Sequence, residues 1–327
     1  MNAIGGYFEL ELCGGEHYHK DAIRLNTARN CLEYILKAKQ YEKIHIPYYT
    51  CEVILEPMIK CNVEYEFYRI NEQLEPAIDI TLEDNEAFLY TNYFGLKQNC
   101  VERLAAIYSS RLIVDNAQAF YAKPLEGIDT FYSARKFFGV ADGAYLYTNK
   151  VLNCEFEQDL SYERMAHLLK RIDINAEAGY DDFKMNDTSL IGQPIKKMSF
   201  LTESILSSIN YQKIKEIRKE NYAYFDNRLK NINQLNFMLE GEDIPMVYPF
   251  LSRQKNLKQE LIKNKIFGAT YWSNIFDWCN KNSLEYFYAE NIAFLPIDQR
   301  NSLLNLEKIK NVLYKDNVKI LNRYNYV

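Results

Sequence analysis

The first 150 residues alternate short runs rich in β-branched and aromatic residues with segments of helical periodicity. The runs that we expect to form strands are residues 43–48, 63–69, 87–92, 111–115, 129–133 and 144–148. Strand, helix and strand in this order predict parallel β-α-β units. The expected fold is therefore α/β, with a mostly parallel central sheet covered by helices on both faces.

The clearest helix begins near residue 28. Its apolar residues lie at helical spacing, on one face: Ala28, Cys31, Leu32, Ile35 and Leu36. A weaker pattern of the same kind runs from Val101 to Tyr108. These helices supply the connections that parallel strands need.

After about residue 150 the sequence becomes long, charged and helical. We expect residues 200–228 to form one long helix, or two broken near Ser208, and residues 175–194 to form a long loop. Farther on, the pattern predicts strands at 246–251, 267–272 and 292–297 and helices at 257–265 and 306–314. We therefore predict a large α/β domain over 1–215 and a smaller C-terminal α+β domain over 216–327.

Composition restricts the partners of the chain. Apolar residues make up 48% and charged residues 25%, and the net charge is −5 with acids and bases interspersed. This predicts no nucleic-acid partner and no membrane partner. The N-terminus has no signal-peptide pattern, and the seven scattered cysteines suggest reduced, mostly buried thiols in a cytoplasmic protein. His17 and His19 lack a third ligand at a metal spacing, so we expect no metal site.

Three segments place polar groups at the edge of the sheet where open α/β folds bind ligands. The first is the start of the clearest helix, where Thr27 can cap the helix and its free N–H groups favour a phosphate. Arg29 adds a charged donor. The alternative for this segment alone is an ordinary helix cap followed by a surface arginine, since helix starts of this kind are common.

The second segment is residues 114–118, where Asp115 ends an apolar strand and Gln118 follows three residues later. An acid at this place can keep the ring nitrogen of pyridoxal phosphate protonated, and Gln118 can reach the phenolic oxygen of the ring. The third is residues 132–139, where Lys136 stands among aromatic residues and beside Arg135. Partial desolvation would lower the pKa of this lysine and favour the amine needed for a Schiff base. A helix cap and an exposed lysine in a turn remain the alternatives.

Five stretches resemble, in order and in register, the DegT/DnrJ/StrS family of sugar aminotransferases. They are Asn-Thr-Ala-Arg-Asn-Cys-Leu (26–32), Ile-Pro-Tyr-Tyr-Thr (46–50), Asn-Tyr-Phe-Gly (92–95), Val-Asp-Asn-Ala-Gln-Ala-Phe (114–120) and Phe-Tyr-Ser-Ala-Arg-Lys-Phe-Phe-Gly-Val-Ala-Asp-Gly-Ala (131–144). Family members are pyridoxal-phosphate enzymes of the aspartate aminotransferase fold, fold type I. The resemblance covers residues 24–148 and is faint beyond 150.

The resemblance implies separate roles for these residues. Lys136 corresponds to the Schiff-base lysine, Asp115 to the partner of the ring nitrogen and Gln118 to the residue near the ring hydroxyl. Ala28 and Arg29 correspond to the turn whose N–H groups meet the cofactor phosphate. The resemblance also implies an amino-acid donor such as glutamate, a nucleotide-linked keto-sugar as acceptor, a setting in surface glycan or polysaccharide biosynthesis, and a homodimer that shares its active sites through residues near 180–200.

The chain departs from the family pattern at several positions. Cys51 stands where the family has an aromatic residue that stacks on the cofactor, and Phe131 stands where it has a serine. Ser133 or Arg29 would then hold the phosphate. Ile195 and Lys197 replace an Asn-x-Arg pair that the partner subunit usually contributes.

Other functions remain open. A pyridoxal-phosphate dehydratase is disfavoured because that chemistry is associated in the family with loss of the lysine. A second alternative is a non-catalytic or regulatory protein that binds a sugar nucleotide or a protein partner. The 27 tyrosines of the chain would suit the interaction surface of such a protein. A nucleotide-binding dehydrogenase is weaker, since no G-x-G-x-x-G sequence follows a strand.

Overall fold

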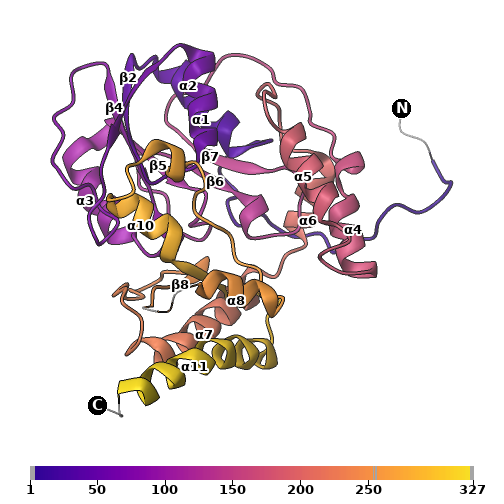
Figure 1. Ribbon diagram of the computed structural model, residues 1–327. Helices are drawn as coiled ribbons and strands as arrows, with labels where there is room; N and C mark the ends of the chain where they lie inside the picture. Colours follow the sequence, from indigo (N-terminus) through magenta and orange to yellow (C-terminus); the bar gives the residue numbers. More distant parts are fainter. Residues whose placement is uncertain (1–3, 253, 255, 325–327) are drawn as a thin grey trace.

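The computed structural model describes residues 4–252, 254 and 256–324. A seven-stranded sheet forms the upper layer of the molecule in Figure 1, and a two-stranded sheet with long helices lies below it. The strands are β1 (Ile23–Leu25), β2 (Lys43–Pro47), β3 (Glu64–Tyr68), β4 (Glu86–Thr91), β5 (Leu112–Asn116), β6 (Asp129–Ser133), β7 (Ala144–Tyr147), β8 (Val247–Phe250) and β9 (Ala293–Pro296). All six strands predicted before residue 150 are present.

The order of the large sheet is β1-β7-β6-β5-β4-β2-β3. The four pairings from β6 to β3 are parallel, whereas β7 is antiparallel to both β6 and β1. The predicted mostly parallel sheet is confirmed. β1 was not predicted because three residues carry too little periodicity to be distinguished from a loop.

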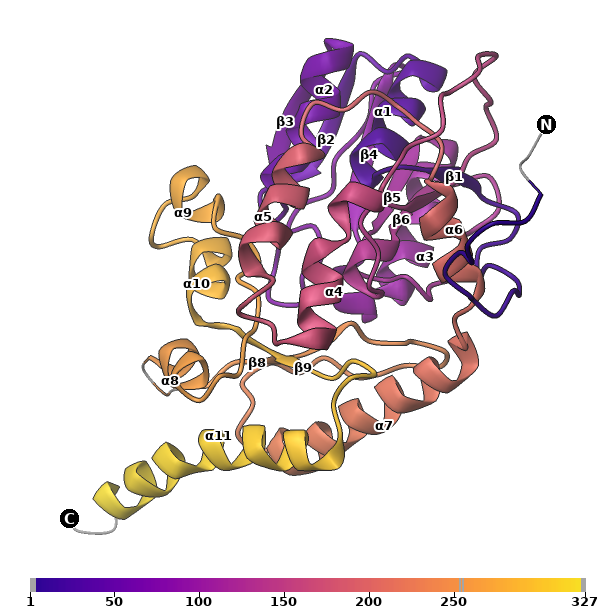
Figure 2. The same cartoon turned by 90° about the vertical axis from the view of Figure 1, so that its right-hand side faces the viewer.

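The helices follow the chain as α1 (Ala28–Lys39), α2 (Leu55–Cys61), α3 (Gln98–Tyr108), α4 (Ala166–Asp173), α5 (Tyr180–Ser189), α6 (Phe200–Ser207), α7 (Tyr211–Leu229), α8 (Leu257–Lys263), α9 (Ile275–Trp278), α10 (Leu284–Asn291) and α11 (Leu303–Tyr324). The long helical segment is two helices, broken at Ser208. In Figure 2, α7 and α11 run along the base of the molecule, and α4 and α5 stand in front of the large sheet.

Both faces of the large sheet are buried, because successive side chains of a strand point to opposite sides. Ile113 packs with α1 and α2 in one core, and Leu112 and Val114 pack in the other with α3 and residues of the C-terminal half. Burial on both faces explains why the central strands are apolar runs without strict alternation.

Two predicted elements are wrong. Residues 175–194 are not one long loop, because they contain α5, whose first turn carries Asp181 and Asp182. Acids at this position interact favourably with the helix dipole, although in sequence they resemble loop residues. Residues 267–272 do not form a strand, since β8 and β9 pair only with each other and Tyr271 packs on Phe94 and Phe294 instead.

The two-stranded sheet lies on a layer formed by α7 and α11, with α8 beside it (Figure 2). Residues 215 and 216, the predicted domain boundary, both lie inside α7. The division into two domains remains a prediction.

All seven cysteines are free, but only three of them are buried, namely Cys31, Cys100 and Cys279. Cys13 and Cys154 are exposed, so the expectation of mostly buried thiols is wrong. Both lie in irregular segments outside the helices and strands.

Candidate functional site

A cavity of about 200 Å³ lies at the carboxyl edge of the large sheet. β4 and β6 end there with Thr91 and Ser133, and Asp115, the second-to-last residue of β5, is paired in register with Thr91. Every residue for which a site role was predicted lines this cavity: Thr27, Ala28, Arg29, Asp115, Gln118, Ser133 and Lys136. The fold therefore brings the three separate segments together, while the role of each residue remains a prediction.

Asp115 is enclosed by the protein but keeps part of its surface in the cavity. Burial raises its pKa to about 6, against the lowering effects of a hydrogen bond from the backbone N–H of Ala117, 2.8 Å from Oδ1, and of the charge on Lys136. A carboxyl group with this pKa changes its charge easily when a cationic group binds beside it.

Gln118 is almost fully buried. Its Oε1 accepts a hydrogen bond from the backbone N–H of Phe94 at 3.3 Å. Its Nε2 is buried without a hydrogen-bond partner among the described residues. A buried amide with one free donor is costly unless a ligand accepts from it, which indicates a ligand oxygen at this place.

Lys136 ends a single 3₁₀ turn, Ala134–Lys136, that follows β6 directly. Its side chain is exposed in the single chain, and Nζ lies 5.6 Å from the ring centre of Tyr271. The expectation that the neighbouring phenylalanines desolvate it is wrong, because Phe137 and Phe138 turn into the core and pack on Phe120.

The start of α1 is capped as predicted. Oγ1 of Thr27 accepts a hydrogen bond from the backbone N–H of Asn30 at 3.1 Å. The N–H groups of Ala28 and Arg29, at the first two helical positions, have no partner within the helix by its geometry. The guanidinium of Arg29, however, forms an ion pair with Glu56 at 2.9 Å, so this group is already neutralised by the protein. The Thr27 hydroxyl already donates a hydrogen bond to Oδ1 of Asn30, so the backbone N–H groups of Ala28 and Arg29 are the better phosphate donors.

Arg135 is a second basic group at the cavity, and its Nη2 lies 3.0 Å from Oδ1 of Asp187 on α5. Burial lowers the pKa of Arg135, an effect that the charge of Asp187 opposes. Sequence reasoning missed Asp187 and Thr91 as lining residues, and it missed Trp272. No spacing rule connects them to the predicted segments, since they come from a helix taken for a loop, from a strand end and from a distant loop.

The positions that depart from the family pattern fall in two places. Cys51 and Phe131 both line the cavity, and burial raises the pKa of the Cys51 thiol. Ile195 is buried and Lys197 is exposed, and neither lines the cavity.

A larger cavity of about 580 Å³ adjoins the first, and both are lined by Arg135 and Lys136. Its outer wall contains Arg171 and Arg300. Burial and the charge of Arg300 lower the pKa of Arg171. Lys136 therefore stands at the junction of an inner pocket and a wider outer pocket.

Within residues 4–252, 254 and 256–324, no three His, Cys, Asp or Glu side chains are grouped so as to hold a metal ion. His17 and His19 instead join an aromatic cluster, where His17 Nδ1 lies 2.6 Å from the hydroxyl of Tyr145. Among the helices in the described part of the chain, none is long and apolar enough to cross a membrane.

No protein-family model and no curated protein sequence matches the chain. Solved structures do. Sugar aminotransferase CalS13 from Micromonospora echinospora is 13% identical over 90% of this chain and 87% of its own, with a TM-score of 0.59. A DegT DnrJ EryC1 StrS aminotransferase from Brucella abortus is 14% identical over 90% and 85%, with a TM-score of 0.58. NtdA from Bacillus subtilis, solved with bound cofactor PMP, is 12% identical over 90% and 72%, with a TM-score of 0.63. The chain thus has the fold that the sequence resemblance implied.

Proposed function

We propose that this chain is a pyridoxal-phosphate-dependent aminotransferase that moves an amino group, from a donor such as glutamate, to a nucleotide-linked keto-sugar. The observation that carries the proposal is the convergence of Asp115, Gln118, Lys136 and the start of α1 on one cavity. The similarity to sugar aminotransferase structures supports the same activity.

The residues of the inner pocket fit the cofactor. Gln118 offers a buried N–H donor that has no acceptor among the described residues, which suits the phenolic oxygen of the ring. Asp115 offers a carboxyl group whose raised pKa favours pairing with a protonated ring nitrogen. The first N–H groups of α1, which Thr27 caps, offer donors to a phosphate. When bound, the cofactor supplies an electron sink for the carbon that gains or loses the amino group.

Lys136 would hold the cofactor through Nζ and, once released, move a proton to or from the substrate carbon. Its place at the junction of the two pockets lets one amine face both the cofactor and the substrate. The ring of Tyr271, which also lines the outer pocket, lies near Nζ.

The outer pocket supports a nucleotide-linked acceptor. Arg171 and Arg300 both line this pocket, and either guanidinium could pair with an anion such as a diphosphate. Arg300 is balanced in part by Asp298, at 2.7 Å. A neutral sugar alone would not use these charges.

We further propose a cytoplasmic homodimer that acts in surface glycan or polysaccharide biosynthesis. The support for the dimer is the number of exposed large apolar side chains on α4, α5 and the segments around them, namely Leu169, Ile172, Tyr180, Phe183, Met185, Ile191 and Phe200. Exposed apolar side chains on this scale are typical of a protein interface.

The direct test is a panel of nucleotide-linked keto-sugars incubated with glutamate and pyridoxal phosphate, with products identified by mass spectrometry. We expect an amino-sugar product that requires the amino donor and is absent with Lys136→Ala. Lys150→Ala is the matched control, because Lys150 is exposed and lines neither pocket. Cofactor binding with no product from any amino donor would favour the regulatory alternative.

A further inference from the structure

Trp272 is set apart from the other residues of the inner pocket. Of the described residues that line it, Trp272 alone comes from beyond residue 187. It lies in the loop between α8 and α9, more than 130 residues after Lys136 in sequence. The chain beyond residue 187 therefore contributes one large side chain to a site that residues 27–187 otherwise build.

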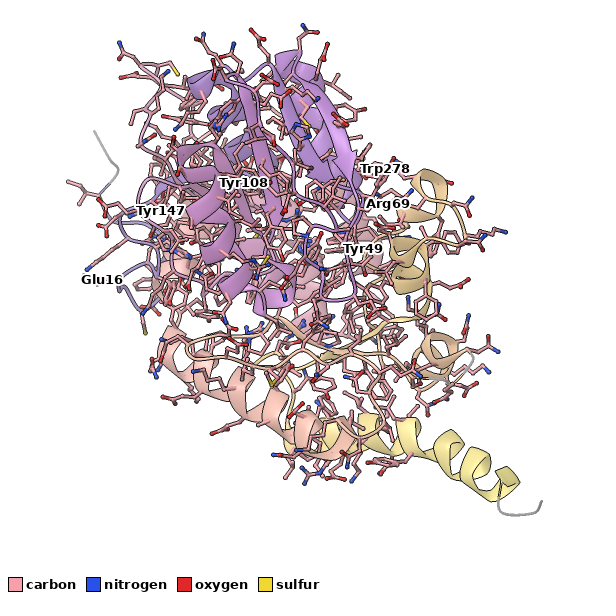
Figure 3. The ribbon with its side chains drawn as sticks, turned by 90° about the vertical axis from the view of Figure 1, so that its left-hand side faces the viewer. Glu16, Tyr49, Arg69, Tyr108, Tyr147 and Trp278 are labelled. Atoms are coloured by element: carbon pink, nitrogen blue, oxygen red, sulfur yellow. The ribbon has the colours of Figure 1, made fainter. Side chains whose placement is uncertain are left out.

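Two contacts hold the loop that carries Trp272 against the segment after β2. Nδ2 of the buried Asn274 donates a hydrogen bond to the carbonyl oxygen of Thr50 at 3.0 Å. The indole ring meets the ring of Tyr49 edge-on, with 5.2 Å between ring centres. These contacts fix the position of the indole against the segment that follows β2. Figure 3 shows Tyr49 at the boundary between the strands and the α9–α10 region.

The indole nitrogen of Trp272 is the feature that calls for a ligand. The side chain is only 7% exposed, and its Nε1 is buried with no hydrogen-bond partner in the part of the chain that the structure describes. Indole N–H groups usually find a partner when buried, and an unpaired donor costs free energy.

Two other side chains of the same pocket share this property. Thr91 Oγ1 and Gln118 Nε2 are also buried without a partner among the described residues. These three polar atoms come from a strand end, a turn and a distant loop, so no single local distortion explains them. Because all three residues line one cavity, they indicate a ligand with several hydrogen-bonding groups.

We propose that Trp272 contacts the cofactor, and that its indole N–H donates a hydrogen bond to the molecule held between Asp115 and Lys136. The indole face also forms the apolar wall that the C-terminal loop adds to the pocket. This inference rests on the proposed function, because it takes pyridoxal phosphate as the occupant of the inner pocket.

Trp272→Phe tests the inference, since phenylalanine keeps an aromatic ring against Tyr49 but removes the N–H donor together with part of the indole volume. Trp278→Phe is the matched control, because Trp278 packs against Phe67 with 5.0 Å between ring centres and does not line the pocket. Wild type and both variants, freed of cofactor, are titrated with pyridoxal phosphate and followed by absorbance. Their thermal unfolding is recorded with and without the cofactor.

We expect Trp272→Phe to raise the Kd for pyridoxal phosphate roughly three- to tenfold, the loss of about one net hydrogen bond, and Trp278→Phe to leave it within about twofold of wild type. Without cofactor, Trp272→Phe should lower the Tm somewhat, because the smaller ring fills less of the buried space beside Tyr49, and with cofactor the fall should be larger. An unchanged Kd, or an equal fall in Tm with and without cofactor, would overturn the inference. So would an unchanged Kd with a higher KM for the keto-sugar, which would assign the indole to the substrate.

The proposed function and this inference fail differently. If wild type binds pyridoxal phosphate and Trp272→Phe binds it equally well, only the inference fails. If wild type binds none, both fail together.

Discussion

Asp115→Asn should stabilise the cofactor-free protein at neutral pH while weakening cofactor binding. The folded protein encloses Asp115 and raises its pKa from 3.8 to about 6. A raised carboxyl pKa means that the ionised form is disfavoured in the folded state. This penalty is fully present above about pH 6 and disappears as the pH falls toward the value of the unfolded chain. Asparagine carries no charge and avoids the penalty.

The size of the effect follows from the pKa. A difference of about two in pKa corresponds to about 3 kcal/mol in the free energy of unfolding. This is an upper bound, because the carboxyl keeps part of its surface in the cavity, where water screens it. At pH 5, about one pH unit below the pKa of Asp115 in the folded protein, the stability gained by Asp115→Asn should be smaller by about 1.4 kcal/mol. The hydrogen bond from the Ala117 N–H can be kept by the amide oxygen of asparagine.

Urea unfolding of cofactor-free wild type and Asp115→Asn at pH 8 and pH 5 measures this difference. The variant should have the larger free energy of unfolding at pH 8 and a smaller advantage at pH 5. In the same protein, the Tm increase caused by pyridoxal phosphate should shrink, because the amide cannot pair with a protonated ring nitrogen. The reasoning is refuted if the variant is less stable than wild type at pH 8, or if its advantage does not change with pH.

Two further predictions concern residues that support the site. Thr27→Ala removes the acceptor of the Asn30 N–H and should lower the free energy of unfolding in urea by about 1 kcal/mol. Thr27→Ser should keep most of this stability, and equal losses in the two variants would argue against the cap. Glu285→Ala should lower the free energy of unfolding by roughly 3 kcal/mol. Buried Glu285 pairs with Arg69 at 2.9 Å and accepts a hydrogen bond from the Ile70 N–H at 3.1 Å, and these contacts join α10 to the segment after β3. A loss no larger than that of Glu290→Ala, at an exposed residue of the same helix, would contradict the prediction.

The sheet was predictable from sequence because its strands are apolar runs between recognisable helices. The edge at which Thr27, Asp115 and Lys136 meet followed from parallel connections alone, since the carboxyl ends of parallel strands share one side. The sequence did not predict which ion pairs and hydrogen bonds these side chains form within the protein. The ion pair of Arg29 with Glu56 depends on the packing of α1 against α2.

The C-terminal half was harder to predict. Residues 267–272 have the aromatic composition of a strand, yet Tyr271 and Trp272 fill space beside the pocket instead. Strand propensity reflects how well a side chain suits a half-buried surface, and a loop packed on the sheet edge offers a similar surface. Trp272 lies at the site only because of this long-range packing, which the sequence pattern does not reveal.

The most direct test of the account is to identify the residue that binds the cofactor. Protein purified with pyridoxal phosphate is reduced with borohydride, digested and mapped by mass spectrometry, with Lys136→Ala and Lys150→Ala treated in parallel. We predict that the reduced cofactor is attached to Lys136 in wild type and Lys150→Ala, and that no peptide carries it in Lys136→Ala. Attachment to another lysine, or the same adduct in Lys136→Ala, would contradict the assignment of the site.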